Sequence, residues 1–432
     1  MTRQLAVIAL LTAASQISAL FKLWFTARVF GIGSELDGYN LALILPTLIS
    51  GIVAGFLQTG LFPVRARLKA TGSAGDVDAF ERAILWGISA AGVTLAMLLA
   101  LGSSAIVPAL AGKAPIAVID AMGAAFPYLA TLLALNMTGD CVGSLLAMRS
   151  RFALAAAAPF ANGIVGGLLL ASWPEGGLAS LVLGTILGLT VQVGICIWGL
   201  RSTGLKLRGP FPAAEHMRSL TRNMLSLGAW ILPGVVLSNL AVSLPPIWVA
   251  SFGEGANSAF GYAYRLHSSV VQLLVMASSP VILAHFADLV ANNDVAAVRL
   301  FLRNTAAASA VLGVLGLTLI ALIGAPLLDW VFGGRFDAEA ASRVASHWWW
   351  MTTGLAFLIL GNVLAKLWQS QQRPGQLSLM AGAGLITLGS TYLLLEGTLH
   401  EYSVAAAMSA SAVVTTLMGI PAARFQGAKT CA

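Results

Sequence analysis

Residues 15–63 decide the fold, and they read SQISALFKLWFTARVFGIGSELDGYNLALILPTLISGIVAGFLQTGLFP. Two apolar segments are separated here by a glycine-containing turn at residues 28–33. If the first segment is a helix, polar side chains at three- and four-residue spacing form one stripe along it: Ser15, Ser18, Lys22 and Thr26. A cation within a lipid-spanning helix persists where it faces a protein interior or a watery cavity. We therefore expect this stretch to line such a cavity.

The composition is that of a polytopic membrane protein. Of the 432 residues, 58% are hydrophobic and only 9% are charged, whereas soluble domains carry about 25% charged residues. The net charge of +7 comes without a basic cluster interleaved with aromatics, so nucleic acid is excluded as a partner. The first apolar run continues past Lys22 without a small-residue cleavage site, which predicts a retained helix and not a signal peptide. Three scattered cysteines, Cys141, Cys196 and Cys431, predict apolar packing and neither a disulfide framework nor a metal site.

Apolar runs near the bilayer-spanning length of about 20 residues predict an all-α protein with about twelve transmembrane helices. The predicted segments are 4–30, 38–63, 83–110, 120–147, 153–172, 177–200, 223–250, 257–286, 305–332, 347–369, 376–396 and 403–423. With the N-terminus inside, seventeen of the 24 Lys and Arg residues fall in cytoplasmic segments and four in outer segments. This positive-inside distribution predicts that both termini are cytoplasmic.

The sequence also predicts two halves joined by a linker. The longest polar connection, residues 201–222, carries five basic residues and follows the sixth segment. The sequence FGIG at 30–33 recurs as FGEG at 252–255, and Arg151 recurs as Arg373, both at an offset of 222. We predict a six-helix bundle at 1–200, a basic cytoplasmic linker at 201–222, a second six-helix bundle at 223–424 and a cytoplasmic tail at 425–432. Such repeats usually place a substrate site at their interface.

Two cations inside predicted helices are candidate ligands for an anionic substrate. Lys22 either snorkels to the outer interface or lines the cavity, where its ammonium suits a phosphate. Arg265 shares one helical face with Tyr262, Ser269, Gln272 and Ser279. It is either a structural partner of Asp37 or Asp140, or a guanidinium fork for a pyrophosphate.

Asp140 falls inside the fourth predicted helix. An intramembrane carboxylate is a candidate for coupling to protons or to a monovalent cation, and a salt bridge or a place near the cytoplasmic end are the alternatives. No phosphate-binding loop, His-Glu-x2-His motif or Gly-x-Ser-x-Gly elbow occurs. We therefore expect no ATPase, no enzymatic activity and no cofactor other than the coupling ion.

The opening stretch resembles the start of the lipid II flippase (MurJ/MviN) family of the multidrug/oligosaccharidyl-lipid/polysaccharide (MOP) exporter superfamily. The matching residues begin at Ser15-Gln16-Ile17, and the later ones are AlaArgValPheGly at 27–31, Asp37-Gly38-Tyr39, Leu45-Pro46, Arg151-Phe152, Ala158-Pro159 and residues 262–266 and 333–375. The resemblance implies two six-helix bundles around a central cationic cavity with alternating access. It places Lys22 where the family has a cavity Arg, Asp37 at the family's Asp, and Arg265 at the cavity Arg of the second half.

Three departures from the family pattern bear on the substrate. Gln16 replaces a further family Arg, and Ile49-Ser50-Gly51 stands where lipid II flippases carry an Arg pair. The twelve predicted segments also lack the extra helix pair that often forms a lipid-tail groove in the family. Fewer cations favour a lipid-linked oligosaccharide other than lipid II, such as an exopolysaccharide repeat unit.

The resemblance implies a flippase for a polyprenyl-pyrophosphate-linked saccharide in the bacterial inner membrane. We expect Lys22 and Arg265 to bind the pyrophosphate, Gln16 to face it, Arg28 and Asp37 to gate or orient the outer side, and Asp140 to couple to an ion. Membrane lipids and glycan polymerases or assembly enzymes are the expected partners of a monomer. The alternatives are a cation-coupled small-molecule exporter, a membrane enzyme acting on lipid-linked glycans, or a non-transporting scaffold.

Overall fold

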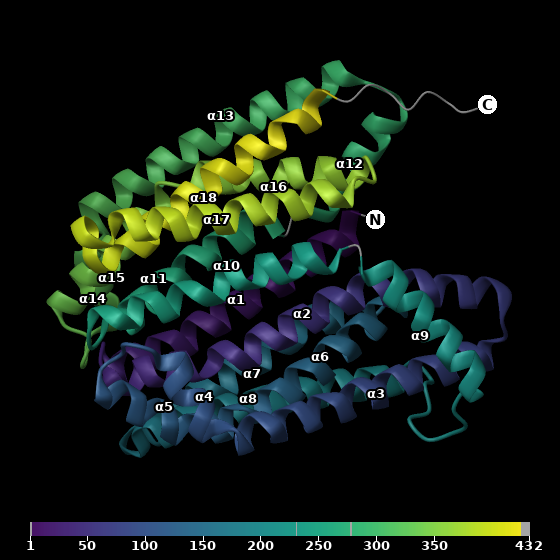
Figure 1. The fold of residues 1–432 in the computed structure, drawn as a ribbon, viewed down its shortest axis with the longest axis horizontal. Helices are drawn as coiled ribbons and strands as arrows, with labels where there is room; N and C mark the ends of the chain where they lie inside the picture. The colour runs from purple at the N-terminus through teal and green to yellow at the C-terminus, as the bar shows by residue number, and fades with distance from the viewer. Residues whose placement is uncertain (1, 230, 277–278, 425–432) are drawn as a thin grey trace. The chain divides into compact units, whose positions relative to one another are not determined.

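The computed structural model describes residues 2–229, 231–276 and 279–424, and these residues form helices joined by short turns (Figure 1). The helices form two compact units. The first unit comprises Met1–Val235 with two short segments, Gly253–Asn257 and Gly334–Phe336. The second unit comprises Val236–Phe252, Ser258–Gly333 and Asp337–Ala432. No strand occurs among the described residues.

The first unit is built from nine helices among its described residues. These are α1 (Thr2–Phe30), α2 (Ser34–Thr71), α3 (Ala74–Leu101), α4 (Ser103–Ala111), α5 (Ile116–Leu129), α6 (Thr131–Met148), α7 (Phe152–Ser172), α8 (Gly177–Ser202) and α9 (Ala214–Ala229). The hydrophobic core at one end of the unit joins α2, α3, α6 and α8, with Leu61, Phe80, Leu145 and Leu200 fully buried. Cys141 and Cys196 are free cysteines buried in this core, as predicted, whereas Cys431 lies outside the described residues.

The second unit holds the remaining helices and contains two π-helical turns. The helices are α10 (Leu232–Val249), α11 (Ala256–Val271), α12 (Ser279–Ala291), α13 (Val295–Leu319), α14 (Ala325–Phe332), α15 (Ala338–Thr352), α16 (Leu355–Ser370), α17 (Pro374–Leu399) and α18 (Ser403–Gly419). The π-helical turns span Gln272–Met276 and Ile320–Gly324. The chain turns between α17 and α18 at His400, whose φ is 48°, and the two helices then pack along each other.

Among the described residues, every predicted apolar segment overlaps one helix or consecutive pieces of helix, so the all-α membrane fold is confirmed. Within the described residues, eight helical stretches are long and apolar enough to cross a bilayer, and the bent pair α15 and α16 would make a ninth. One stretch, Gly375–Ala423, is 49 residues long and covers two predicted segments. The total of twelve spans therefore stays a prediction.

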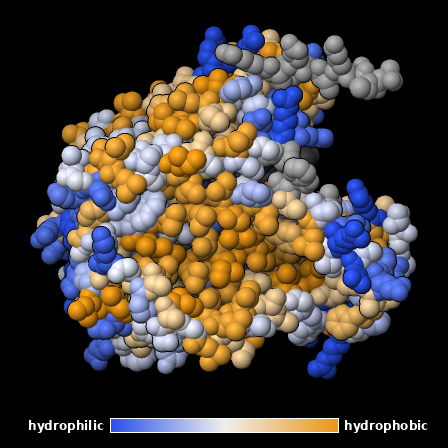
Figure 2. Space-filling model, in the orientation of Figure 1, coloured by the Kyte–Doolittle hydropathy of each residue, from blue (hydrophilic) through white to orange (hydrophobic). Residues whose placement is uncertain are grey.

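Large apolar side chains are exposed along the helices, as lipid contact requires. On α3, for example, Val93, Met97 and Leu101 are exposed. Figure 2 shows hydrophobic side chains over the middle of the first unit's helices and hydrophilic side chains toward their ends. This distribution is typical of a protein whose helices cross a hydrocarbon layer.

The predicted linker is partly helical. Helix α9 begins inside residues 201–222, and α10 begins only at Leu232, so the seventh predicted segment starts too early. Met217, Leu220 and Met224 recur at helical spacing and face the core, while Arg218 and Arg222 are exposed. This amphipathic pattern explains why α9 packs on α2 and does not continue the span of α10.

Glycines allow α1, α7 and α8 to approach closely. A Cβ added at Gly163 of α7 would lie 2.4 Å from the backbone carbonyl of Ser18, and one added at Gly188 of α8 would lie 2.7 Å from the backbone oxygen of Asn162. Small residues at helix contacts are the usual means of close packing within membranes. The three helices thus form a tight group that fixes the position of Lys22.

Candidate functional site

Lys22 is held within the first unit by a hydroxyl network. Its side chain is half-buried and crosses Gly166 of α7, where an added Cβ would lie 2.9 Å from the Lys22 Cδ. The Nζ donates to Thr185 Oγ1 at 2.8 Å, and Tyr39 Oη lies 2.7 Å from the same oxygen. Because the Thr185 hydroxyl donates its only proton to the Leu181 carbonyl, it accepts from both Lys22 and Tyr39. The ammonium is therefore positioned by α8 and α2 together.

The rest of the predicted polar stripe does not line a cavity. Ser15, Ser18 and Thr26 are 7%, 1% and 2% exposed. Their hydroxyls donate to backbone carbonyls of α1 itself, and Ser15 also donates to Ala156 of α7 at 3.0 Å. Serine and threonine hydroxyls in apolar helices commonly donate their hydrogen bond to a backbone carbonyl of the preceding turn. The stripe therefore contributes to helix packing. Gln16, beside it, is half-buried.

Arg28 lies at the end of α1, next to the turn predicted at residues 28–33. Its side chain is exposed, and its guanidinium lies 4.8 Å above the ring of Trp24. Its carbonyl accepts from the backbone N–H of Arg335 at 3.1 Å. Gly334, with φ of +68°, approaches the same carbonyl so closely that an added Cβ would lie 2.7 Å from it. Only glycine fits this contact.

Asp37 is fully buried in the first turn of α2. Its Oδ2 accepts from the backbone N–H of Gly255 at 2.7 Å, and Gly255 has a φ of +78°. The segment Gly253–Asn257, which belongs to the first unit, is thus attached to the start of α2. Gly255 is the last residue of the second copy of the repeated glycine turn, so the carboxylate that follows the first copy along the chain is bonded to the second copy.

Arg265 belongs to α11, in the second unit, and its side chain is half-buried. Its backbone carbonyl accepts from the hydroxyls of Ser268 and Ser269 at 3.1 and 2.8 Å. The predicted polar face does not run on to Ser279, because α11 ends at Val271 and a π-helical turn follows. Tyr262, one turn before Arg265, is buried with its ring 6.1 Å from that of Phe332.

Asp140 lines a cavity of about 540 Å³ inside the first unit. One face of α6, with Cys141, Leu145 and Leu146, packs into the core, while the opposite face borders the cavity. The Asp140 side chain is exposed there, and it makes no hydrogen bond or ion pair with any residue that the structure describes.

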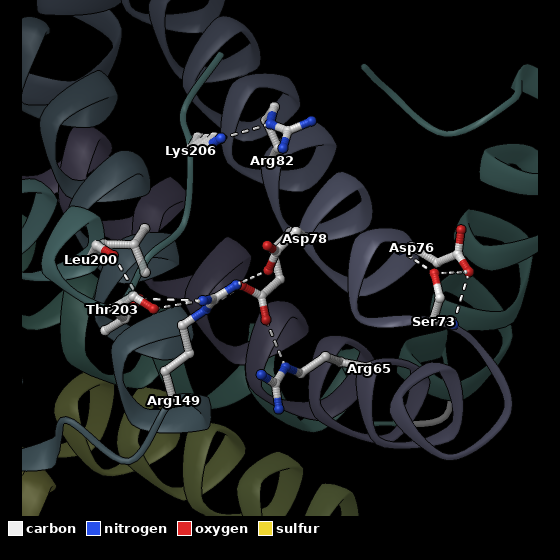
Figure 3. Close-up of polar contacts among 10 residues, drawn as sticks. Arg65, Ser73, Asp76, Asp78, Arg82, Arg149, Leu200, Thr203 and Lys206 are labelled. Carbon is white, nitrogen blue, oxygen red and sulfur yellow. Dashed lines mark hydrogen bonds and ion pairs between the residues drawn. The ribbon is translucent and has the colours of Figure 1, made fainter. Parts of the chain in front are cut away.

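A buried ionic cluster, which the sequence did not reveal, joins α2, α3, α6 and α8 (Figure 3). Glu81 is fully buried and accepts from Arg65 Nε at 2.8 Å and from Arg149 Nε at 2.6 Å. Arg149 also pairs with Asp78 and donates to Thr203 Oγ1 at 3.3 Å. Burial alone would lower the pKa of Arg149. The charges and hydrogen bonds of Glu81 and Asp78 raise the pKa by more than burial lowers it, so the net pKa lies above the ordinary value.

Beside this cluster, α3 holds the connection between α8 and α9. Arg82 Nε donates to the Lys206 carbonyl at 2.8 Å, and its Nη1 donates to that of Pro210. Trp86 Nε1 donates to the Leu207 carbonyl at 3.0 Å. No local sequence pattern indicates these contacts, because Arg82 and the carbonyls it binds lie far apart in the chain.

The fold is that of a known class of membrane transporter. It matches a solved structure of lipid II flippase MurJ in an inward closed conformation, with a TM-score of 0.80 and 15% identity, over 97% of this chain and 88% of that chain. It also matches an inward-facing multidrug resistance MATE family transporter of the MOP superfamily, with a TM-score of 0.72 and 14% identity, over 98% and 96% of the two chains. The protein is thus a multi-pass membrane protein with a transporter fold.

The sequence comparisons are more specific. The sequence model described as "Lipid II flippase MurJ" matches residues 26–429. A probable lipid II flippase MurJ of Rhizobium meliloti (strain 1021) is 26% identical over 296 residues, which are 64% of this chain and 53% of that protein. The chain therefore belongs to the lipid II flippase MurJ family. The match spans about half the length of this curated relative.

Proposed function

We propose that this protein moves a polyprenyl-diphosphate-linked saccharide from the inner to the outer leaflet of the bacterial inner membrane. Membership of the lipid II flippase MurJ family over residues 26–429 supports a lipid-linked substrate. The observation that carries the proposal is Lys22, an ammonium within a long apolar helix, positioned by Thr185 at 2.8 Å. Maintaining a cation in such surroundings is costly, and a diphosphate ligand accounts for it.

Lys22 and Arg265 are the proposed diphosphate ligands of their respective units. An ammonium acts as a hydrated point charge toward phosphate, whereas a guanidinium offers a planar pair of donors. Both side chains are half-buried, which leaves part of each accessible. Asp37 has a different role, because its buried carboxylate already accepts from Gly255. With Arg28, it is proposed to keep the outer turn in place.

The saccharide is proposed to be either lipid II or an exopolysaccharide repeat unit on the same diphosphate carrier. Gln16 and Ser50 are neutral where arginines would strengthen binding of an anionic headgroup. The diphosphate is common to both substrates, so the two cations serve either one. The two headgroups differ in that lipid II carries a peptide and the exopolysaccharide repeat unit does not.

The experiment is flipping of defined lipids by the purified protein in proteoliposomes. One arm contains lipid II, and the other contains a polyprenyl-diphosphate oligosaccharide without a peptide. We expect Lys22→Ala and Arg265→Ala each to slow flipping at least about tenfold, which equals about 1.4 kcal/mol. Lys22→Arg should retain more activity than Lys22→Ala because the charge remains.

Lys113→Ala is the matched control, because Lys113 is an exposed lysine of the same unit. Its flipping rate should equal that of the unmodified protein. Wild-type rates for both Lys22→Ala and Arg265→Ala, in protein that elutes as a single species, would refute the assignment of the diphosphate ligands. No flipping of either lipid by the unmodified protein would refute the proposed function itself.

A further inference from the structure

Helix α6 carries a row of polar side chains on the face that borders the cavity of about 540 Å³. Asn136, Asp140 and Ser144 recur at four-residue spacing, so they lie one above the other along this face. Gln58 of α2 and Gln192 of α8 add two more amides to the lining. The other residues of α6 that line the cavity are small and leave space in front of it: Gly139, Gly143 and Ala147.

These five polar side chains do not hold the helices together. None of them makes a side-chain hydrogen bond with any residue that the structure describes. By contrast, the hydroxyls of Thr26 and Thr185 donate to carbonyls of their own helices. All five are exposed or half-buried, so a molecule that enters the cavity can reach them. Unused hydrogen-bonding groups gathered in one cavity of an apolar protein indicate a polar ligand.

The mixture of donors and acceptors indicates the chemistry of that ligand. Each amide offers both N–H donors and a carbonyl acceptor, the serine hydroxyl donates and accepts, and the carboxylate only accepts. A metal cation would use only the acceptors, and an anion would use only the donors. A ligand hydroxyl donates and accepts at the same time, so it can use the whole set, and its bond to a carboxylate is charge-assisted. The lining therefore favours a molecule with many hydroxyl groups.

The rest of the lining suits the less polar faces of such a molecule. The ring of Phe62 is exposed, and Pro159 and Leu189 add further apolar surface. A sugar ring carries C–H groups on its faces and hydroxyls around its edge, so it can contact both kinds of surface. Ligand sites commonly combine apolar walls with a few polar groups in a volume of about 300–1,000 Å³, and this cavity lies within that range.

The cavity lies close to Lys22 along the same two helices. Lys22 crosses Gly166 of α7 and donates to Thr185 of α8, whereas Pro159 of α7 and Gln192 of α8 line the cavity. On both helices the separation is seven residues, or about 10 Å at 1.5 Å per residue, toward the end that carries the ionic cluster. A saccharide attached to a diphosphate at Lys22 can therefore extend into the cavity.

We infer that this cavity binds the saccharide of the lipid-linked substrate and selects an uncharged one, with Asp140 and the three amides bonding its hydroxyl groups. The inference rests on the proposed function for the kind of substrate and adds the place and the selectivity of saccharide binding. A sugar acid would bring a second negative charge beside Asp140. No lysine or arginine is among the described residues that line the cavity, so nothing there offsets that repulsion.

The test is binding of free disaccharides to the purified full chain in detergent, measured by saturation-transfer difference NMR. It needs neither a diphosphate nor flipping. The uncharged probes are cellobiose and N,N′-diacetylchitobiose, and cellobiouronic acid is the acidic counterpart of cellobiose. We expect saturable binding of at least one uncharged probe, and we expect cellobiose to bind at least about tenfold more tightly than cellobiouronic acid.

Variants of the lining locate the binding. Asn136→Ala and Gln192→Ala should each weaken binding of the uncharged probe about three- to tenfold, as expected for the loss of one hydrogen bond. Gly143→Leu should abolish binding, because an added Cβ there meets no atom within 4 Å and the larger side chain would fill part of the cavity. Asn223→Ala is the matched control, since Asn223 is an exposed asparagine of the same unit outside the cavity.

Asp140→Asn tests the selectivity by a gain. The substitution keeps a hydrogen-bonding side chain of the same size and removes the negative charge, so cellobiouronic acid should then bind about as tightly as cellobiose. A damaged protein would bind both probes less tightly, so this result cannot come from partial unfolding.

Several results would overturn the inference. One is the absence of saturable binding of both uncharged probes, and another is undiminished binding by both Asn136→Ala and Gln192→Ala. Continued rejection of cellobiouronic acid by Asp140→Asn would refute the selectivity. If lipids are flipped but no disaccharide binds, the inference alone fails. If a disaccharide binds but no lipid is flipped, the proposed function fails and the saccharide site stands. If Gly143→Leu fails to elute as a single species, the two alanine variants decide.

Discussion

Glu81 shows, for a single residue, that the role of a charged side chain in an apolar protein depends on partners that only the structure reveals. In the sequence, Arg65 and Arg149 count only as cytoplasmic positive charges. In the structure both donate to the same fully buried carboxylate, so they are also packing elements. The partner could not be predicted, because α2, α3 and α6 meet there through tertiary packing alone.

Removing Glu81 should therefore be costly. Glu81→Ala leaves two guanidinium groups at a buried site without their acceptor, and the free energy of unfolding should fall by about 3–5 kcal/mol. Asp78→Asn should lower it by less than about 1 kcal/mol, because the Asp78 side chain is 39% exposed. Thermal unfolding in detergent compares the two variants, and a larger loss in Asp78→Asn would contradict this ranking.

Thr185 is the second residue whose role depends on its neighbours. Thr185→Val keeps the shape of the side chain but removes the oxygen that accepts from Lys22 and lies beside Tyr39. Leaving these groups without that partner should cost about 1–3 kcal/mol of stability, and flipping should slow because the ammonium loses its position.

The matched control for this change is Thr190→Val. Thr190 is exposed on the same helix and bonds only to the Ile186 carbonyl among the contacts described, at 2.7 Å. Its substitution should leave unfolding temperature and flipping rate nearly unchanged. Equal losses in the two variants would show that the Lys22 contact has no special role.

At the scale of elements, the contact between α1 and α7 depends on glycine. The Cβ of Gly163→Ala would meet the backbone of Ser18 at 2.4 Å, and backbone atoms cannot move aside as a flexible side chain can. We expect overpacking to cost about 1–3 kcal/mol. Gly143→Ala, which meets no atom within 4 Å, should be neutral or slightly stabilising. Thermal unfolding of both variants is the measurement, and equal stability would argue against close packing at Gly163.

Sequence patterns predicted most of the helices but few of the contacts between them. Length and hydropathy predicted the approximate positions of the apolar helices among the described residues, because those properties belong to each segment on its own. They did not separate α9 from α10, since the amphipathic α9 runs directly into apolar sequence. The spacing of Ser15, Ser18 and Thr26 predicts a cavity lining, but these residues are buried in helix contacts, because small polar residues serve equally well in helix packing.

At the scale of the whole molecule, the family could be recognised from short motifs, whereas the chemistry of the sites needed the structure. Asp140 is conspicuous in the sequence because a carboxylate is rare within a membrane helix. The amides that border the same cavity come from three other positions on α2, α6 and α8 and share no sequence pattern. Thr185, which positions Lys22, lies 163 residues away in the chain. Such partners are defined by folding and not by local periodicity.

The orientation of the molecule in the membrane supplies the last prediction. The excess of basic residues in alternate connections predicts that residues 201–222 are cytoplasmic and that Lys113 lies outside. Cys141 and Cys196 are buried, so a chain carrying Cys431→Ser should react poorly with a membrane-impermeant maleimide. In that background, intact cells should label Lys113→Cys, whereas Arg208→Cys should react only after permeabilisation. Both positions are exposed on the protein, so sidedness and not burial decides the outcome. If intact cells label Arg208→Cys and not Lys113→Cys, the protein has the opposite orientation in the membrane. The proposed direction of transport would then be wrong.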